Sequence, residues 1–161
     1  MEIRNKQGHL IHPGNKANFF DNLDLHEAAL EGMILQGAHF DGANLAGANL
    51  RGTDFYWGNF FRANLSGADL EGVQFQGADL KGANLTNANL RNANFGRDNL
   101  GGSTQLQGAT LIGTSLTATN LEGAEYSLET VFPERFSPEA AKMILRGQVN
   151  PLRKKRRHRP R

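Results

Sequence analysis

Leucine or phenylalanine recurs at every fifth residue through most of this chain. The run begins at Phe20 and continues without a break to Leu100. After a one-residue insertion around 101–102, the same spacing resumes at Leu106, and Val131 closes it. An α-helix repeats every 3.6 residues and a strand every 2.0, so neither keeps every fifth side chain on one face. We therefore predict a repeat in which the chain changes direction every five residues.

Most five-residue units also carry a small residue two positions before the apolar centre. The phrase A-(N/D)-L-x-(G/N) recurs, as in ANLAG, ADLEG and ANLTN. Gly or Asn at the unit boundary favours a turn, and Asn or Asp before the centre can hydrogen-bond to nearby backbone. The centre and the small residue share one side of a short extended segment. We expect stacked coils that pair backbone to backbone, with every centre from Phe20 to Tyr126 buried.

The phenylalanine centres fall into two series, each with a spacing of twenty residues. The two series are Phe20, Phe40 and Phe60, and Phe55, Phe75 and Phe95. Twenty residues make four repeats, so this spacing predicts a four-sided coil with two phenylalanine ladders on adjacent sides.

Runs such as AHFDGANLAGANLRGTDF and ADLKGANLTNANLRNANF resemble the pentapeptide-repeat family. The resemblance covers residues 17–131 and implies an all-β solenoid, a right-handed quadrilateral β-helix. The segment YSLETVFPERFSPEAA is similar to segments that follow the repeats in cyanobacterial members, which suggests a cyanobacterial source.

The ends of the chain depart from the repeat. We expect a flexible N-terminal arm over 1–16 and a C-terminal capping segment over 132–149. Ser137 suits a helix N-cap, Pro138 the first helical position and Gly147 the C′ position, so this segment predicts a short helix covering the last coil. A dimer contact through the same segment is the alternative to a monomer.

Two acidic residues interrupt the inward positions of the repeat. Asp98 stands where a small residue is expected, just before the insertion, and predicts a bulge with its carboxylate turned outward or bonded to turn amides. Glu129 takes an inward position near the end of the run and indicates that the core ends there. We expect no long loops between the coils.

Charge is segregated along the chain, although its net value is only +2. Residues 17–131 carry five basic and thirteen acidic residues, a net −8, and the flanks carry a net +10. The segment 150–161 is too basic to bury a core, and we expect it to be a disordered tail that docks an anionic partner such as nucleic acid, an anionic membrane surface or an acidic protein. Its cationic residues are Arg153, Lys154, Lys155, Arg156, Arg157, Arg159 and Arg161.

The sequence offers no basis for catalysis. It has no cysteine, which excludes disulfides and thiolate sites. His9 and His12 lack a third metal ligand nearby, and no phosphate-binding loop is present. We expect a non-enzymatic protein with no cofactor, no metal and no small-molecule substrate. Without a signal-like or membrane-spanning apolar stretch, a cytoplasmic location is expected.

Three aromatic residues fall at outward positions of the repeat. Tyr56 and Trp57 follow the centre Phe55, and Phe61 follows the centre Phe60 on the adjoining side. Exposed aromatics among polar neighbours are typical of binding hot spots, so these three are the candidate partner-binding residues. The alternative is packing against the N-terminal arm.

Two functions remain open. The first is a non-catalytic protein-interaction scaffold or adaptor, an acidic rod with an aromatic patch and a basic tail. The second is implied by the family resemblance: some members mimic DNA in shape and charge and bind a type II topoisomerase, DNA gyrase. The −8 repeat region favours the second function, and the +10 flanks oppose it.

Overall fold

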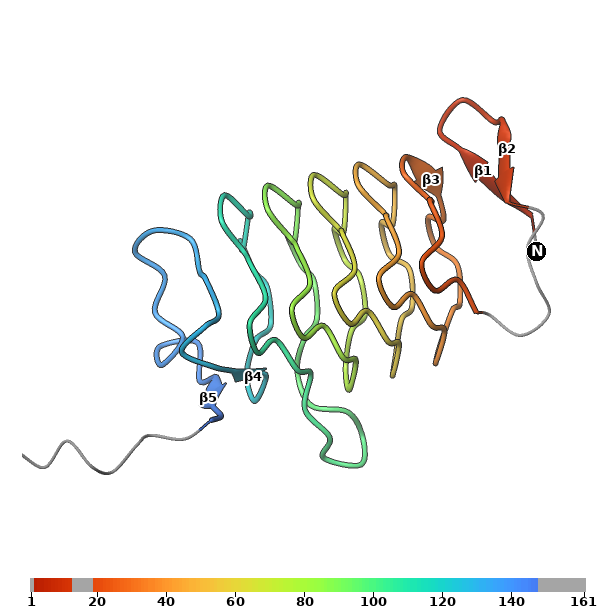
Figure 1. The fold of residues 1–161 in the computed structure, drawn as a ribbon. Helices are drawn as coiled ribbons and strands as arrows, with labels where there is room; N and C mark the ends of the chain where they lie inside the picture. The colour runs from red at the N-terminus through yellow and green to blue at the C-terminus, as the bar shows by residue number, and fades with distance from the viewer. Residues whose placement is uncertain (1, 13–18, 148–161) are drawn as a thin grey trace, which may run out of the picture.

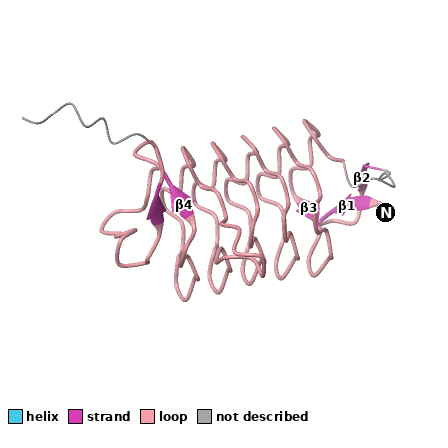
Figure 2. Ribbon diagram, turned by 90° about the horizontal axis from the view of Figure 1, so that it is seen from below, coloured by secondary structure: helices cyan, strands magenta, loops and turns pink. Residues whose placement is uncertain are grey.

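The described residues, 2–12 and 19–147 of a computed structural model, form a column of stacked four-cornered coils (Figure 1). Most of the chain is turns and isolated bridges, and no helix occurs in the two described ranges (Figure 2). The regular strands are short. They are β1 (Ile3–Asn5), β2 (Leu10–His12), β3 (Ala28–Ala29), β4 (Glu125–Tyr126) and β5 (Ile144–Leu145).

Successive coils are joined by parallel single-residue bridges. In the regular coils, the two partners of a bridge are twenty residues apart in the sequence. His39 pairs with Asn59, and Asn59 pairs with Asp79. Two backbone hydrogen bonds make such a bridge: Phe40 N donates to Asn59 O at 2.7 Å, and Asn59 N donates to Ala38 O at 2.9 Å. The predicted coil of four repeats is confirmed.

Each regular corner of the coil is a β-turn. The carbonyl of a centre residue accepts a hydrogen bond from the N–H three residues ahead, as from Ala63 N to Phe60 O at 3.0 Å. The third residue of the turn has a positive φ, which favours Gly; Gly67, for example, has φ 65°. Asn64 accepts from the backbone N–H two residues ahead at 3.2 Å and donates to Asn44 Oδ1 on the previous coil at 3.0 Å. The expected local bonding of these asparagines is confirmed.

Two ladders of stacked phenylalanine rings form the centre of the core. The rings belong to Phe20, Phe40 and Phe60 on one side of the coil and to Phe55, Phe75 and Phe95 on the next. Neighbouring centroids lie 4.9 Å apart in the first ladder, and 5.6 and 5.2 Å apart in the second. All six side chains are fully buried, so the predicted ladders are confirmed. These two sides of the coil are called the Phe60 side and the Phe55 side below.

One long loop interrupts the coils, contrary to prediction. Asp79 pairs with Gln105, 26 residues later instead of 20, so six residues are inserted in place of the expected one. The six extra residues are part of a loop at 96–103, the insertion loop, which projects from the column (Figure 1). Leu100 matches the five-residue spacing but lies in this loop with 77% of its surface exposed, so its predicted burial is wrong. The buried Thr104 resumes the inward positions, and its hydroxyl donates to Phe75 O at 2.7 Å.

The N-terminal segment is ordered where it is described, which corrects the prediction of a flexible arm for residues 2–12. β1 pairs with β2 as an antiparallel hairpin and with β3 of the first coil, also antiparallel. Ile3 is fully buried against the first coil. The hairpin therefore caps one end of the core, where bare strand edges would otherwise invite pairing with other chains.

The C-terminal segment covers the last coil without a helix, so the predicted helix is wrong. Ser137 Oγ does accept the N–H of Ala140 at 3.1 Å, as an N-cap would, but only one turn follows. β5 then pairs in parallel with β4, because pairing satisfies the strand edge of the last coil better than a short isolated helix would. Met143 is buried in this cap, and Phe136 packs against the core.

The core does not end at Glu129 as predicted. Glu129 is exposed, and the next residue, Thr130, is buried with its hydroxyl donating to Leu106 O at 2.9 Å. Thr110 pairs with Val131, 21 residues later, so one extra residue precedes the inward position. Val131 consequently lies in the bridge and not at a buried centre.

The described part of the chain contains no helix long and apolar enough to cross a membrane. The basic tail, 150–161, lies outside the described residues.

Candidate interaction site on the Phe55 side

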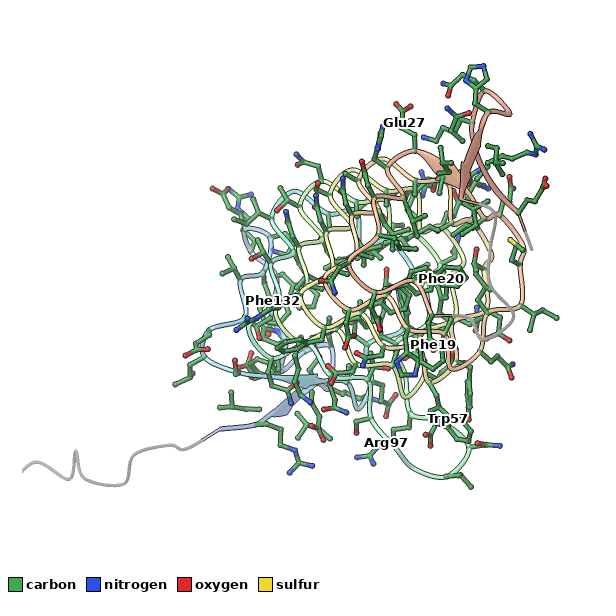
Figure 3. The ribbon with its side chains drawn as sticks, turned by 45° about the vertical axis from the view of Figure 1, so that its right-hand side comes forward. Phe19, Phe20, Glu27, Trp57, Arg97 and Phe132 are labelled. Atoms are coloured by element: carbon green, nitrogen blue, oxygen red, sulfur yellow. The ribbon has the colours of Figure 1, made fainter. Side chains whose placement is uncertain are left out.

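Tyr56 and Trp57, the aromatic pair, lie on the outside of the column immediately after the buried Phe55. Trp57 projects away from the coils, whereas Phe20 points into them (Figure 3). The two rings of the pair have centroids 4.8 Å apart, and 49% of the Trp57 surface is exposed. Trp57 is therefore neither part of the core nor packed against the N-terminal hairpin.

Trp57 occupies the turn position that favours glycine. Its φ is 57°, whereas the matching positions one coil before and one coil after are Gly37 and Gly77. The left-handed conformation disfavours a side chain by roughly 1–2 kcal/mol. Arg62, in the next turn, has the same conformation at φ 55°, so these turns accept a side chain at this cost.

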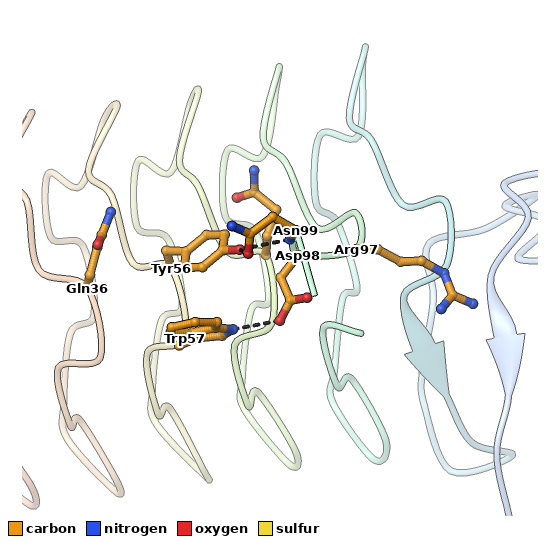
Figure 4. A pocket seen from close by; sticks show the side chains of 7 residues that line it. Gln36, Tyr56, Trp57, Arg97, Asp98 and Asn99 are labelled. Carbon is orange, nitrogen blue, oxygen red and sulfur yellow. Dashed lines mark hydrogen bonds between the residues drawn. The ribbon is translucent and has the colours of Figure 1, made fainter. Parts of the chain in front are cut away.

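The insertion loop folds back over the aromatic pair. Trp57 Nε1 donates to Asp98 Oδ2 at 2.6 Å. The Tyr56 hydroxyl donates to Asn99 Oδ1 and accepts the backbone N–H of Asn99 at 2.9 Å (Figure 4). Two residues of the loop thus engage the polar atoms of two adjacent aromatic side chains.

Asp98 also shapes the loop itself. Its Oδ1 accepts the N–H groups of Leu100 at 2.9 Å and Gly102 at 2.6 Å, so the predicted bonding to turn amides is confirmed. The hydrogen bond from the Trp57 indole is the largest cause holding the pKa of Asp98 below its ordinary value of 3.8. Asp98 therefore accepts these bonds as a carboxylate at neutral pH.

Glycines provide the room for this contact. A Cβ at Gly77 would collide with Trp57 Cδ1, so the indole lies directly over the backbone of the next coil. A Cβ at Gly102 would collide with Asp98 Oδ2. The close approach of ring, coil and loop depends on both glycines.

A hollow opens beside the aromatic pair, with a volume of about 640 Å³. Gln76 Oε1 is buried there without a hydrogen-bond partner. Gln36 Nε2 donates to Asp54 Oδ2 at 2.6 Å on the same side of the column. The hollow is lined by Gln36, Tyr56, Trp57, Gln76, Arg97, Asp98 and Asn99.

Phe61, the third predicted aromatic, lies on the Phe60 side. The Arg62 guanidinium carbon lies 5.0 Å from the centroid of its ring, a cation–π contact. Phe61 does not line the hollow, so the structure groups only two of the three predicted aromatics.

Asp98 and Asn99 were not predicted as members of the site. A signal was available, because two coils of twenty residues on from Trp57 lead to residue 97, at the start of the insertion. The sequence did not show that the loop folds towards Trp57 and not away from it.

In residues 2–12 and 19–147, no group of three or more His, Asp or Glu side chains is arranged to hold a metal ion. The seven basic residues predicted to bind anions, Arg153, Lys154, Lys155, Arg156, Arg157, Arg159 and Arg161, lie outside these ranges.

The chain matches the family model for pentapeptide repeats at residues 24–60 and 59–97, with eight copies of the repeat. It is 30% identical to a solved pentapeptide repeat protein from the thylakoid lumen of Arabidopsis thaliana, covering 69% of this chain and 67% of that one, with a TM-score of 0.43. A pentapeptide repeat protein from Nostoc PCC 7120 is 28% identical, with 80% and 85% coverage and a TM-score of 0.43. No significant match was found among curated proteins.

The chain belongs to the pentapeptide repeat family, as its repeats and sequence identity show. Membership implies the right-handed, four-sided β-helix, and no catalytic family is indicated. QnrB1, a plasmid-mediated fluoroquinolone resistance protein, is also similar, at 17% identity, 80% and 65% coverage and a TM-score of 0.42. That likeness is one of fold alone.

Proposed function

We propose that this protein is a non-catalytic, cytoplasmic interaction scaffold or adaptor that binds a protein partner through the aromatic pair. The observation that carries the proposal is Trp57: a half-exposed indole retained in a left-handed turn position where glycine would be unstrained. Tryptophan and tyrosine are enriched at energetic centres of protein interfaces. The rigid coil beneath them holds both rings in place before binding, which reduces the entropy lost on association.

The basic tail supplies a second contact in this proposal. Its seven cationic residues have the opposite charge to the acidic repeat region. We expect them to act together on an anionic partner. Folding back onto the rod would form only exposed ion pairs, each worth about 0–1 kcal/mol. A polyanion such as RNA also gains from counterion release, so we expect the external partner to be preferred.

A capture experiment tests the proposal. The intact protein, Trp57→Gly and a form lacking residues 150–161 are immobilised, and bound proteins from native lysate are compared. Ile112→Ser is the matched control, since Ile112 is also exposed but lies elsewhere on the column. Trp57→Gly is expected to lose a partner that Ile112→Ser retains. Equal capture by both variants would refute the role of the aromatic pair.

The alternative, a DNA mimic that binds DNA gyrase, is favoured only by the net −8 of the repeat region. Several of those acids are offset locally: Arg51 Nη1 lies 2.6 Å from Glu71, and Lys81 Nζ lies 3.0 Å from Asp79. A supercoiling assay with gyrase and a quinolone tests this function. Relief of inhibition that survives removal of 150–161 would support it, and no relief at molar excess would refute it.

A further inference from the structure

The insertion loop makes contacts that the coil does not require. Backbone bridges continue on both sides of it: Phe75 N donates to Asn94 O at 2.8 Å, and Leu80 N donates to Gln105 O at 2.8 Å. Removing residues 97–102 would leave five steps from Phe95 to Leu106, the spacing of every regular repeat. The loop is therefore an addition to a complete coil, and the question is what its docking achieves.

The hydrogen bonds that dock the loop on earlier coils are confined to the aromatic pair. In the described part of the chain, the hydrogen bonds that join residues 97–102 to earlier coils are those of Asp98 with Trp57 and of Asn99 with Tyr56. The remaining hydrogen bonds of this segment lie within the loop, such as Asp98 N to Gly102 O at 2.8 Å. Leu100, at the loop's tip, is largely exposed. Few hydrogen bonds hold the loop on the aromatic pair, so a competing segment can replace it there.

We propose that the insertion loop is an internal ligand of the aromatic pair, and that the external partner is a protein segment with an aspartate or glutamate in a tight turn, which displaces the loop. This inference rests on the proposed function and names the chemistry of the partner. The loop occupies the two hydrogen-bonding groups that a partner would need, the Trp57 indole N–H and the Tyr56 hydroxyl. Its own contacts therefore describe what the site accepts.

Three features of the docked loop define that chemistry. A carboxylate oxygen accepts the indole N–H, and a charged acceptor makes a stronger bond than a neutral one. The same carboxylate is oriented by N–H groups two and four residues ahead, which requires a tight turn after the acid. The next residue presents a backbone N–H and a side-chain acceptor to the Tyr56 hydroxyl.

The residues that loop displacement would expose suit such a segment. With the loop displaced, the site would consist of Tyr56, Trp57, Gln36 and Gln76, which carry no formal charge. A carboxylate would then meet neutral donors at Trp57 and Tyr56, while the nearby acid Asp54 is already bonded by Gln36 Nε2 and the backbone N–H of Tyr56. Gln76 Oε1 would be free to accept an N–H from the incoming turn. Binding would be strongest for a segment whose turn is already formed.

The first experiment tests the docking. A loop-less variant lacks residues 97–101 and 103, so that Gly102 takes the left-handed corner position after Gly96. The probe is a cyclic peptide of the loop sequence GRDNLGGS, and the readout is the Trp57 indole N–H signal in ¹⁵N NMR; Trp57 is the single tryptophan. Loop removal is expected to shift this signal, and the peptide to shift it back. A peptide with Asn for Asp is expected to bind about tenfold more weakly.

The indole signal and the binding of the peptides decide whether the loop is a ligand of the aromatic pair. An indole signal that loop removal leaves unchanged, or a loop-less variant that ignores both peptides at millimolar concentration, would overturn the inference. Asp98→Ala serves as a second loop-release variant with the full chain length, should the loop-less variant fail to fold. Displacement of the peptide by an unrelated cyclic peptide with an Asp-Gly turn, but not by its Asn-Gly counterpart, would support the chemical class.

The second experiment separates this inference from the proposed function. The loop-less variant and Asp98→Ala are expected to capture severalfold more of the Trp57-dependent partner than the intact protein, and the loop peptide is expected to elute it. Trp57-dependent capture that neither loop release nor the peptide affects would overturn the inference and leave the proposed function standing. Absence of any Trp57-dependent capture by any form would refute both.

Discussion

The rings of Phe55 and Phe60 meet edge to face, with centroids 4.8 Å apart and planes at 78°. Five residues separate them along the chain, and one corner of the coil lies between them. Phe55 also stacks on Phe75 of the next coil, and Phe60 stacks on Phe40 of the previous coil, so the corner is packed in two directions at once. Interiors packed this closely have little room to relax around a deletion.

Core truncation is therefore expected to be costly. Leu65→Ala removes a fully buried side chain and should lower the free energy of unfolding by about 2–5 kcal/mol. Ser66→Ala, one residue later and only partly buried, should change it by less than about 0.5 kcal/mol. Denaturant titration of the two variants measures both values. Similar losses for both would contradict the assigned register.

Trp57 should be more easily replaced by glycine than by alanine. Both variants lose the bond to Asp98, but only glycine relieves the left-handed strain at φ 57°. We expect Trp57→Gly to be more stable than Trp57→Ala by about 1 kcal/mol in denaturant titration. The reverse order would show that the turn is not strained.

Docking of the insertion loop should weaken in acid. The Trp57 indole bond lowers the pKa of Asp98 below 3.8 in the folded state, so the ionised form is favoured by docking. Its contribution is present above the unfolded-state pKa, near 4, and is lost as the pH falls through the lower, folded-state value. The Trp57 indole signal should titrate in that acid range, and Asp98→Ala should abolish the transition. A transition that persists in Asp98→Ala would assign it to another group.

The contribution of Asp41 to the pH dependence of stability should have the opposite sign. Burial is the largest cause raising its pKa, Asp21 adds like-charge repulsion, and Asp41 Oδ1 has no hydrogen-bond partner. The ionised carboxylate is thus disfavoured in the fold, and its cost is present above the raised folded-state pKa and absent in acid. We expect Asp41→Asn to raise the free energy of unfolding at pH 7 and to have less effect near pH 3. Asp24→Asn is the control, because hydrogen bonding to His26 lowers the pKa of Asp24.

The tail should bind polyanions in a salt-dependent way. For single-stranded RNA, log affinity should fall linearly with log salt, with a slope of about −0.7 per phosphate contacted. Removing residues 150–161 should flatten the slope and leave the thermal melt of the coils nearly unchanged. No single arginine is expected to dominate, so Arg156→Ala alone should have a small effect. Equal RNA binding by intact and truncated protein would contradict the tail's role.

The five-residue period determined the coil and the place of nearly every core side chain, and the twenty-residue spacing of the phenylalanine centres determined its four sides. Phe20, Phe55 and Leu65 are predictable because each repeat contacts the next in the same way, so a local rule of small residue, apolar centre and turn extends along the whole column. The outward positions of Tyr56 and Trp57 follow from the same rule. Only the tertiary structure decided how the two ends of the repeat column are covered and where the repeat is interrupted.

The exceptions have one physical reason in common: each depends on a contact that the five-residue rule does not describe. Leu100 keeps the spacing but is exposed, because the bridge from Asp79 to Gln105 assigns the inward position to Thr104. The N-terminal hairpin and β5 form because strand edges at the two ends of the column need partners, which local helix-capping signals at Ser137 do not reveal. The bond between Trp57 and Asp98 joins residues 41 positions apart through the direction in which one loop folds, and periodicity carries no information about that direction.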